Sequence, residues 1–102
     1  QLSLKTTTID TLCRRGILET DRCNFLNVDV QGAELLVLKG MTGLLPQIDY
    51  INAEINKAEL YVGCPLVHDV DAYLNSFGFK RVHEDWARNT GWGDGFYVRA
   101  VV

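Results

Sequence analysis

The chain has 102 residues, 47% of them hydrophobic, and a formal net charge of -3. This length suits one small domain, and the hydrophobic content supports a packed core rather than disorder. The acidic balance argues against a nucleic-acid-binding protein, which normally presents a basic face. No run of like charges suggests a membrane-surface patch, and the sequence shows neither a signal peptide nor an apolar stretch of membrane-spanning length.

The three cysteines, Cys13, Cys23 and Cys64, are widely spaced and form no CxxC pair. An odd number of cysteines argues against a closed disulfide framework. We therefore expect reduced, mostly buried thiols in a reducing compartment, and a cytoplasmic location. The sequence starts at Gln1 rather than at a methionine, so we expect the native chain to extend upstream.

The N-terminal part predicts one short helix. Residues 1–8 suit an edge strand or an extended lead-in. Thr8 is a typical N-cap for a helix over residues 9–15, with Asp10 in its first turn and Gly16 at its end.

The stretch NFLNVDVQGAELLVLKG, residues 24–40, organises the rest of the chain. Residues 25–30 form a short apolar run, which is typical of a strand in a parallel sheet. A helix is predicted over residues 33–45, and Pro46 stops it. The apolar stripe expected to face the sheet contains Leu35, Leu38, Met41 (or Thr42) and Leu45.

The second half predicts a strand, a helix and two further strands. The two helical crossovers predict parallel strands, and the last two strands should pair antiparallel because no helix joins them. His68, Asp69 and Asp71 are expected on the exposed side of the helix. A turn-rich segment, DWARNTGWGDG, is read as a loop, with turn chemistry at Asp94 and Gly95. The predicted elements are a strand over 48–55, a helix over 66–77, a strand over 79–84, a loop over 85–95 and a strand over 96–102.

Three acids mark the predicted ends of strands and the start of a helix. Asp29 ends the first buried strand, Glu34 opens the following helix, and Glu54 lies near the end of the next strand. Ligands of open α/β sheets bind beyond the C-terminal ends of the strands. The alternatives remain that Asp29 caps the helix, that Glu34 only complements the helix dipole, and that Glu54 is a solvated acid.

Several motifs together resemble the FkbM family of S-adenosylmethionine-dependent methyltransferases. They are TTTIDTLCRR at residues 6–15, VDVQGAELLVLKGM at 28–41, SFGF at 76–79 and GDGFYVR at 93–99. The family pattern is a strand ending in Ile/Val-Asp, a hydrophobic residue, usually Glu, and then Gly-x-Glu and a helix. Gln31 stands where the family usually has Glu. Because an amide cannot act as a base, this departure weakens any catalytic role at Gln31.

The resemblance implies an α/β fold, namely the C-terminal part of a Rossmann-like class I methyltransferase sheet. That sheet has seven strands in the order 3-2-1-4-5-7-6 and three layers, α/β/α. Residues 1–102 would form a single partial domain with strands 4 to 7, parallel except for a final antiparallel hairpin. The glycine-rich loop that holds the cofactor would lie upstream, so we assign no cofactor-binding residue.

The resemblance also implies a reaction. The chain would be the acceptor-side half of an O-methyltransferase that uses S-adenosylmethionine to methylate a hydroxyl of a small molecule or glycan. Asp29, Glu34 and Glu54 are the predicted catalytic residues. We assign no metal site, although two or three carboxylates at one point could hold Mg²⁺. Tyr61 and Trp92 are predicted to bind substrate, with aromatic packing over the sheet edge as the alternative.

Other functions remain open. The chain could be a non-catalytic remnant or interaction module that no longer binds cofactor, and we expect it to be inactive on its own. A nucleotide-binding domain would need a phosphate loop, which the sequence lacks. Neither His68 nor His83 fits a zinc pattern. If strand 24–30 lies at a sheet edge, it should promote self-association.

Overall fold

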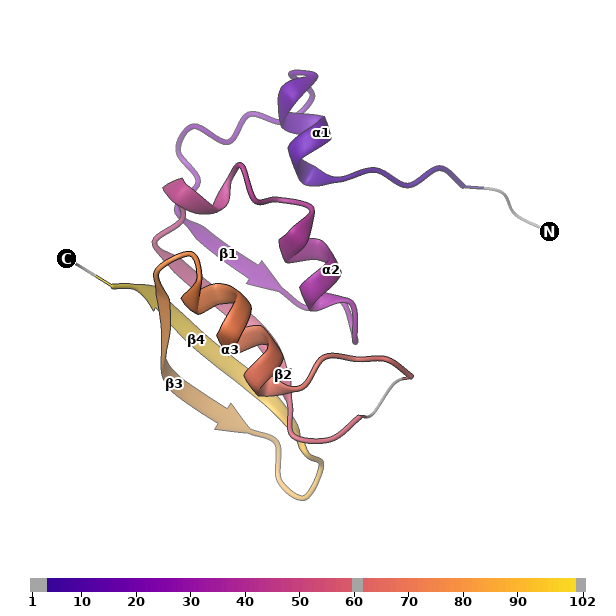
Figure 1. The fold of residues 1–102 in the computed structure, drawn as a ribbon, viewed down its shortest axis with the longest axis vertical. Helices are drawn as coiled ribbons and strands as arrows, with labels where there is room; N and C mark the ends of the chain where they lie inside the picture. Colours follow the sequence, from indigo (N-terminus) through magenta and orange to yellow (C-terminus); the bar gives the residue numbers. More distant parts are fainter. Residues whose placement is uncertain (1–3, 60–61, 101–102) are drawn as a thin grey trace.

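The computed structural model describes residues 4–59 and 62–100, which form a small α/β domain (Figure 1). The first part of the chain contains helix α1 and strand β1, and it continues through helix α2, the 3₁₀ helix η1 and strand β2. The second part contains helix α3 and a hairpin of strands β3 and β4. The bounds are α1 Ile9–Arg14, β1 Phe25–Val28, α2 Glu34–Lys39, η1 Leu45–Gln47, β2 Tyr50–Asn56, α3 Val67–Asn75, β3 Phe79–Trp86 and β4 Trp92–Arg99.

The four strands form one mixed sheet in the order β1-β2-β4-β3. Strands β1 and β2 are parallel, whereas β4 pairs antiparallel with both β2 and β3. The predicted antiparallel hairpin is therefore confirmed. The predicted parallel pairing is confirmed only for β1 and β2, because β4 lies between β2 and β3.

Helices α2 and α3 lie on the same face of the sheet (Figure 1). That face holds the core, because Ile51, Ala53 and Ile55 of β2 and Tyr97 of β4 are all 0% exposed. The shortest dimension of the molecule is 19 Å, which fits one sheet with one layer of helices. The described residues thus form two layers, and the third layer of the predicted α/β/α arrangement is not present among them.

Helix α1 forms largely as the sequence predicts. The Thr8 side chain accepts a hydrogen bond of 3.0 Å from the backbone N–H of Thr11. The Asp10 carboxylate accepts hydrogen bonds from the Thr42 hydroxyl and the Gly43 N–H, so it ties α1 to the segment after α2. No strand forms among residues 4–8, and residues 1–3 of the predicted lead-in lie outside the described part.

The helix predicted over residues 33–45 is too long. Helix α2 ends at Lys39, and the chain continues through turns into η1, where Pro46 lies at the first helical turn. The predicted apolar stripe is nonetheless correct at three positions, because Leu38, Met41 and Leu45 are buried. Gly40, which ends the helix, carries less helical preference than other residues.

The loop predicted over residues 85–95 is too long, because only residues 87–91 lie between the strands. Strand β3 continues to Trp86 and β4 begins at Trp92, so both tryptophans belong to strands. Asp94 and Gly95 lie inside β4 rather than in a turn. The physical reason is close packing at Gly93, where an added Cβ would lie 2.3 Å from the carbonyl oxygen of Asp85.

Two side-chain networks fasten the helical layer to the sheet. Asp71 of α3 accepts hydrogen bonds from the Arg81 guanidinium and from the Tyr97 hydroxyl, the latter at 2.6 Å. Asp71 was predicted on the exposed side of the helix, and it is instead partly buried in this network. Arg99 donates to the backbone carbonyls of Leu45, Ile48 and Phe77.

The cysteines are free thiols, but the prediction that most are buried is wrong. Cys64 is buried, Cys13 is partly buried and Cys23 is exposed. Cys23 lies in the connector before β1, outside the packed layers.

Candidate functional site

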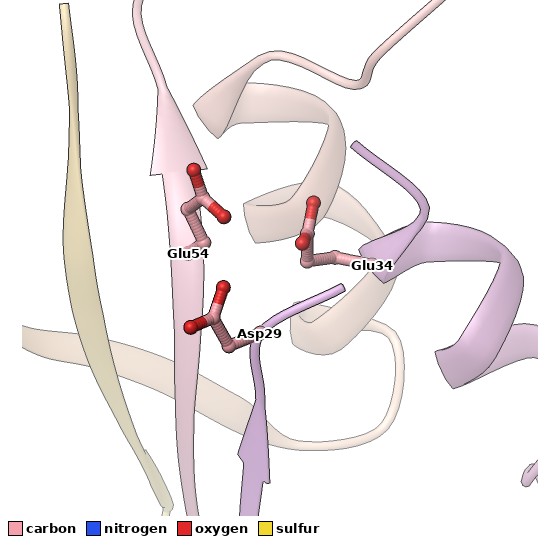
Figure 2. A group of neighbouring side chains, drawn as sticks. All are labelled: Asp29, Glu34 and Glu54. Atoms are coloured by element: carbon pink, nitrogen blue, oxygen red, sulfur yellow. The ribbon is translucent and has the colours of Figure 1, made fainter. Parts of the chain in front are cut away.

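The candidate site lies where strands β1 and β2 reach their C-terminal ends. Val28, the last residue of β1, is opposite Ala53 in the parallel register, so Asp29 follows beside Glu54. Asp29 is exposed and Glu54 is partly buried. Figure 2 shows Asp29, at the end of β1, with its carboxylate directed toward Glu54 of β2.

Glu34 reaches the same point from the start of α2 and is fully buried. Its carboxylate accepts hydrogen bonds from the backbone N–H groups of Val30, at 3.0 Å, and Gly32, at 3.1 Å. These bonds offset the cost of burying a charged group. The intervening turn requires two left-handed residues, with φ of 51° at Gln31 and 97° at Gly32. The turn thus holds the acid in place.

The three carboxylates converge closely. One oxygen from each of Asp29, Glu34 and Glu54 lies within 4.8 Å of the others. The structure thus brings together the three acids that were predicted as catalytic residues, as Figure 2 shows.

The environment raises the pKa of Glu54 to about 7. Burial is the main cause, followed by the nearby charge of Glu34, a hydrogen bond with the Asp29 carboxyl, and the charges of Asp29 and Asp94. Like charges at short range disfavour full ionisation of a carboxylate pair. Glu54 can therefore accept and release a proton near neutral pH.

This arrangement permits two kinds of chemistry. A carboxylate whose pKa lies near neutrality is suited to accept a proton from a bound hydroxyl. Three oxygen atoms in one place also form a partial ligand set for a hard divalent cation. Both possibilities use the same three residues.

The two residues predicted to bind substrate, and the other residues weighed in the sequence, are placed as follows. Gln31 lies in the turn between β1 and α2 and is exposed. Trp92 is opposite Asn56 at the start of β4, and it is 40% exposed. Tyr61 lies outside the described residues. His68 and His83 are both exposed.

Sequence reasoning missed Asp94. The antiparallel register places Asp94 directly opposite Glu54, and its charge contributes to the raised pKa of that residue. The GDG sequence around Asp94 is typical of a turn. For this reason the sequence did not predict that Asp94 lies in a strand. An alternation of glycines with larger residues, at Gly93 and Gly95, was the signal that could have found it.

The comparisons with known proteins identify the family. The family model of the methyltransferase FkbM domain matches residues 2–81, a span that includes Asp29, Glu34 and Glu54 and ends before Asp85. No curated protein and no solved structure matches the chain. No helix in the described part of the chain has the length and apolar character needed to cross a bilayer. Because the family model covers most of the chain, the protein belongs to the FkbM methyltransferase domain family.

Proposed function

We propose that this chain forms the acceptor-side half of an S-adenosylmethionine-dependent O-methyltransferase. Membership of the FkbM family supports methyl transfer as the activity. The strand order β1-β2-β4-β3 supports the assignment to strands 4 to 7 of a Rossmann-like class I methyltransferase sheet, whose last four strands run 4-5-7-6. The observation that carries the proposal is the meeting of Glu54, whose pKa is raised to about 7, with Asp29 at the C-terminal edge of the parallel strands.

In this proposal Glu54 is the general base. The hydroxyl of the acceptor loses its proton to the ionised Glu54 carboxylate as its oxygen becomes methylated. Asp29 hydrogen-bonds to Glu54 and stabilises the proton once it has been transferred. Burial is the main cause of the raised pKa of Glu54, and the charge of Glu34, whose carboxylate is fixed by the backbone of the turn, is the second. General-base catalysis of this kind contributes about 10²–10⁴-fold to the rate.

S-adenosylmethionine, when bound, would supply the methyl group as an electrophile. Among residues 4–59 and 62–100, no glycine-rich turn connects a strand to a helix in the pattern that holds such a cofactor. The described residues fit the acceptor side of the reaction and not the cofactor side. We therefore assign no cofactor contact. We expect no detectable binding of S-adenosylmethionine to this chain alone.

The acceptor is proposed to be a hydroxyl of a small molecule or a glycan. Trp92 supports this, since it is partly exposed on the same face of the sheet as Glu54 and could stack against an acceptor ring. Tyr61 is the second residue that we propose to contact the acceptor. The three free thiols support a reducing compartment such as the cytoplasm.

The test is a methyl-transfer assay with the complete protein and with the 102-residue chain in parallel. Isotopically labelled S-adenosylmethionine is offered with a panel of hydroxylated sugars and small molecules. We expect transfer by the complete protein, and loss of transfer in Asp29→Asn and Glu54→Gln. Asp49→Asn is the matched control, because Asp49 is an exposed acid just before β2, at the opposite end of the strand.

The non-catalytic alternative makes a different prediction. A remnant or interaction module of this fold would give no transfer and no cofactor binding in calorimetry, even in the complete protein. Micromolar binding of S-adenosylmethionine to the 102-residue chain would instead show that the cofactor site is misplaced in our proposal.

We also propose that the chain self-associates through residues 24–30. Strand β1 is the edge of the sheet, and Phe25 is 53% exposed. Unpaired edge strands favour pairing with another chain. Light scattering should therefore show dimers or larger species at high protein concentration, and a monomer throughout would contradict this proposal.

A further inference from the structure

Strand β3 forms one edge of the sheet, on the side away from β1 (Figure 1). Among the described residues, β3 pairs with β4 on its inner side and with no strand on its outer side. In our assignment to a class I methyltransferase sheet, β3 is strand 6, the last in the strand order of that fold. The upstream part of such a domain would extend the sheet at β1, so it would leave the outer edge of β3 uncovered.

The sequence of β3 is complementary in charge to its own reverse. It reads FKRVHEDW, with Lys80 and Arg81 in its first half and Glu84 and Asp85 in its second half. When two copies of the strand run in opposite directions, the cationic residues of each meet the acids of the other. Lys80 is then opposite Asp85, and Arg81 is opposite Glu84. Opposite charges across an antiparallel pair stabilise a sheet.

A β-bulge gives the inner pair of charges the same face of the sheet. Opposite residues of an antiparallel pair share a face, but residues 81 and 84 of a regular strand would lie on different faces, because side chains alternate. The register with β4 places Arg81 opposite Tyr97 and then shifts. After the shift, Glu84 is opposite Gly95, two residues from Tyr97. The extra residue therefore brings Arg81 and Glu84 to one face, where they also form an ion pair within the chain.

The outer pair of charges follows the same rule. Lys80 is opposite Val98 of β4. Asp85 is opposite Asp94, which is four residues from Val98, so Lys80 and Asp85 also share a face. Both side chains are exposed, and within residues 4–59 and 62–100 neither forms an ion pair. Two exposed charges of opposite sign are thus available to a second strand.

From these observations we propose that the protein forms a two-fold symmetric dimer in which β3 pairs antiparallel with β3 of a second copy. The symmetry axis passes through the position of His83, which is opposite Phe96 and midway between the two charged halves. The two sheets then join into one continuous sheet, with the helices of both copies on the same side. The outward N–H and C=O groups of β3 bond to those of the second copy instead of to water.

The charges of β3 also select this arrangement over others. A parallel pair of β3 strands would place Lys80 opposite Lys80 and Asp85 opposite Asp85, which is unfavourable. Pairing of β3 with β1 would bring no opposite charge to either residue, because β1 has the sequence FLNV. Charged residues and bulges commonly protect an edge strand from pairing. In β3 the two signs lie in opposite halves, so they exclude these other pairings and favour one antiparallel register.

Charge reversal with complementation tests the proposal in the complete protein and in the 102-residue chain. Lys80→Asp and Asp85→Lys each place two like-charged pairs across the symmetry axis. Each variant should therefore weaken dimerisation at least about tenfold, as measured by sedimentation velocity. A mixture of the two variants restores both pairs with their signs exchanged, so it should form a heterodimer. A chain that carries both changes should dimerise as the native chain does.

Matched controls separate the β3 edge from a response to net charge. Lys5→Asp and Glu19→Lys make the same changes of charge at exposed positions outside the sheet. We expect both to leave dimerisation unchanged. Circular dichroism verifies that every variant is folded.

Hydrogen exchange separates the β3 edge from the β1 edge. Backbone amides of residues 79–86 should exchange more slowly as the protein concentration rises, and Lys80→Asp should remove this protection. Association through β1 would instead protect residues 25–28 and would not respond to Lys80→Asp.

Three outcomes would overturn the proposal. The first is a native protein that remains monomeric at every concentration. The second is undiminished dimerisation in Lys80→Asp and Asp85→Lys. The third is the absence of a heterodimer when these two folded variants are mixed. None of these measurements depends on methyl transfer, so the dimer and the proposed activity can fail separately.

Discussion

Two side-chain clusters in this small domain place carboxylates in opposite electrostatic surroundings. Asp71 has a cation beside it, since its carboxylate forms an ion pair of 3.0 Å with Arg81 and accepts the Tyr97 hydroxyl. Asp29, Glu34 and Glu54 meet one another, and within residues 4–59 and 62–100 none of them forms an ion pair with a cationic side chain. We call the first the matched cluster, because its carboxylate has a cationic partner, and the second the frustrated cluster, because its carboxylates repel one another.

The electrostatic consequences differ accordingly. At the first cluster, burial and the hydrogen bond to Asp71 raise the pKa of Tyr97 far above its ordinary value, so the hydroxyl remains a hydrogen-bond donor at every physiological pH. At the second, the pKa of Glu54 rises to about 7, so its protonation changes within the physiological range. Perturbed carboxylates without counter-ions are typical of functional sites, whereas matched networks are typical of structural ones. We therefore expect the two clusters to respond to mutation in opposite ways.

The largest expected effect is on catalysis at the frustrated cluster. Glu54→Gln in the complete protein should lower kcat by about 10²–10⁴-fold, because it removes the proposed base. Steady-state kinetics of methyl transfer measure this change. The thermal unfolding midpoint should stay the same or rise, since one repelling charge is removed. A large fall in stability would instead make Glu54 a structural residue and erase the contrast with Asp71.

The next largest effect is on stability at the matched cluster. Asp71→Asn should lower the free energy of unfolding by about 2–3 kcal/mol, because Arg81 and Tyr97 both lose a charge-assisted partner. Urea denaturation measures it, with Asp85→Asn as the control for an exposed strand carboxylate. A decrease in the free energy of unfolding below about 0.5 kcal/mol would contradict this prediction, because an effect of that size is typical of exposed surface ion pairs.

The pH dependence of stability should separate the clusters further. The pKa of Glu54 is raised from 4.5 to about 7 on folding, so the folded state binds more protons than the unfolded state between these values. Its contribution to stability is present below pH 4.5 and is lost as the pH rises to 7. After allowance for solvent screening, we expect a decrease of about 1–2 kcal/mol.

Urea denaturation at several pH values measures this decrease. Glu54→Gln should flatten the profile over that range, whereas Asp71→Asn should shift the whole profile downward without changing its slope. A steep profile that persists in Glu54→Gln would show that another group titrates.

The smallest expected effect concerns Asp94. Its charge is the weakest of the causes that raise the pKa of Glu54. Asp94→Asn should therefore lower that pKa by a few tenths of a unit, measured by NMR titration of the Glu54 side-chain carboxyl carbon. Asp49→Asn should leave the titration unchanged. An equal shift in the two variants would indicate a response to net charge instead of to the acid opposite Glu54.

Much of the frustrated cluster was predictable from sequence. Asp29 and Glu34 flank a turn between an apolar run and a helix, and both local patterns are strong signals. The parallel pairing of β1 with β2 then follows from the crossover, which brings Glu54 beside Asp29. The matched cluster was not predictable, since Asp71, Arg81 and Tyr97 meet only through packing of separate elements.

The hairpin shows most clearly where local rules fail. Trp86, Trp92 and Asp94 were read as parts of a loop because glycines and small polar residues surround them. Gly95 is there for packing, since an added Cβ would lie 3.1–3.2 Å from side-chain atoms of Ile55 and Tyr97. Some glycines are needed because a neighbouring strand or side chain packs closely against the backbone, and others because the chain turns. The sequence alone does not distinguish these two kinds of glycine. Tertiary contact also overrode the helical pattern that predicted α2 too long.

The place of β4 in the sheet has a consequence for synthesis on the ribosome. It is the last of the four strands along the chain, yet it lies between β2 and β3. Until residue 99 has emerged, the nascent chain has β2 and β3 without the strand that joins them. It also lacks the Arg99 guanidinium, which donates hydrogen bonds to the backbone carbonyls of Leu45, Ile48 and Phe77. Many domains begin to fold from the N-terminus while they are being synthesised. In this domain, only the β1–β2 pair of the native sheet can form before β4 has been made.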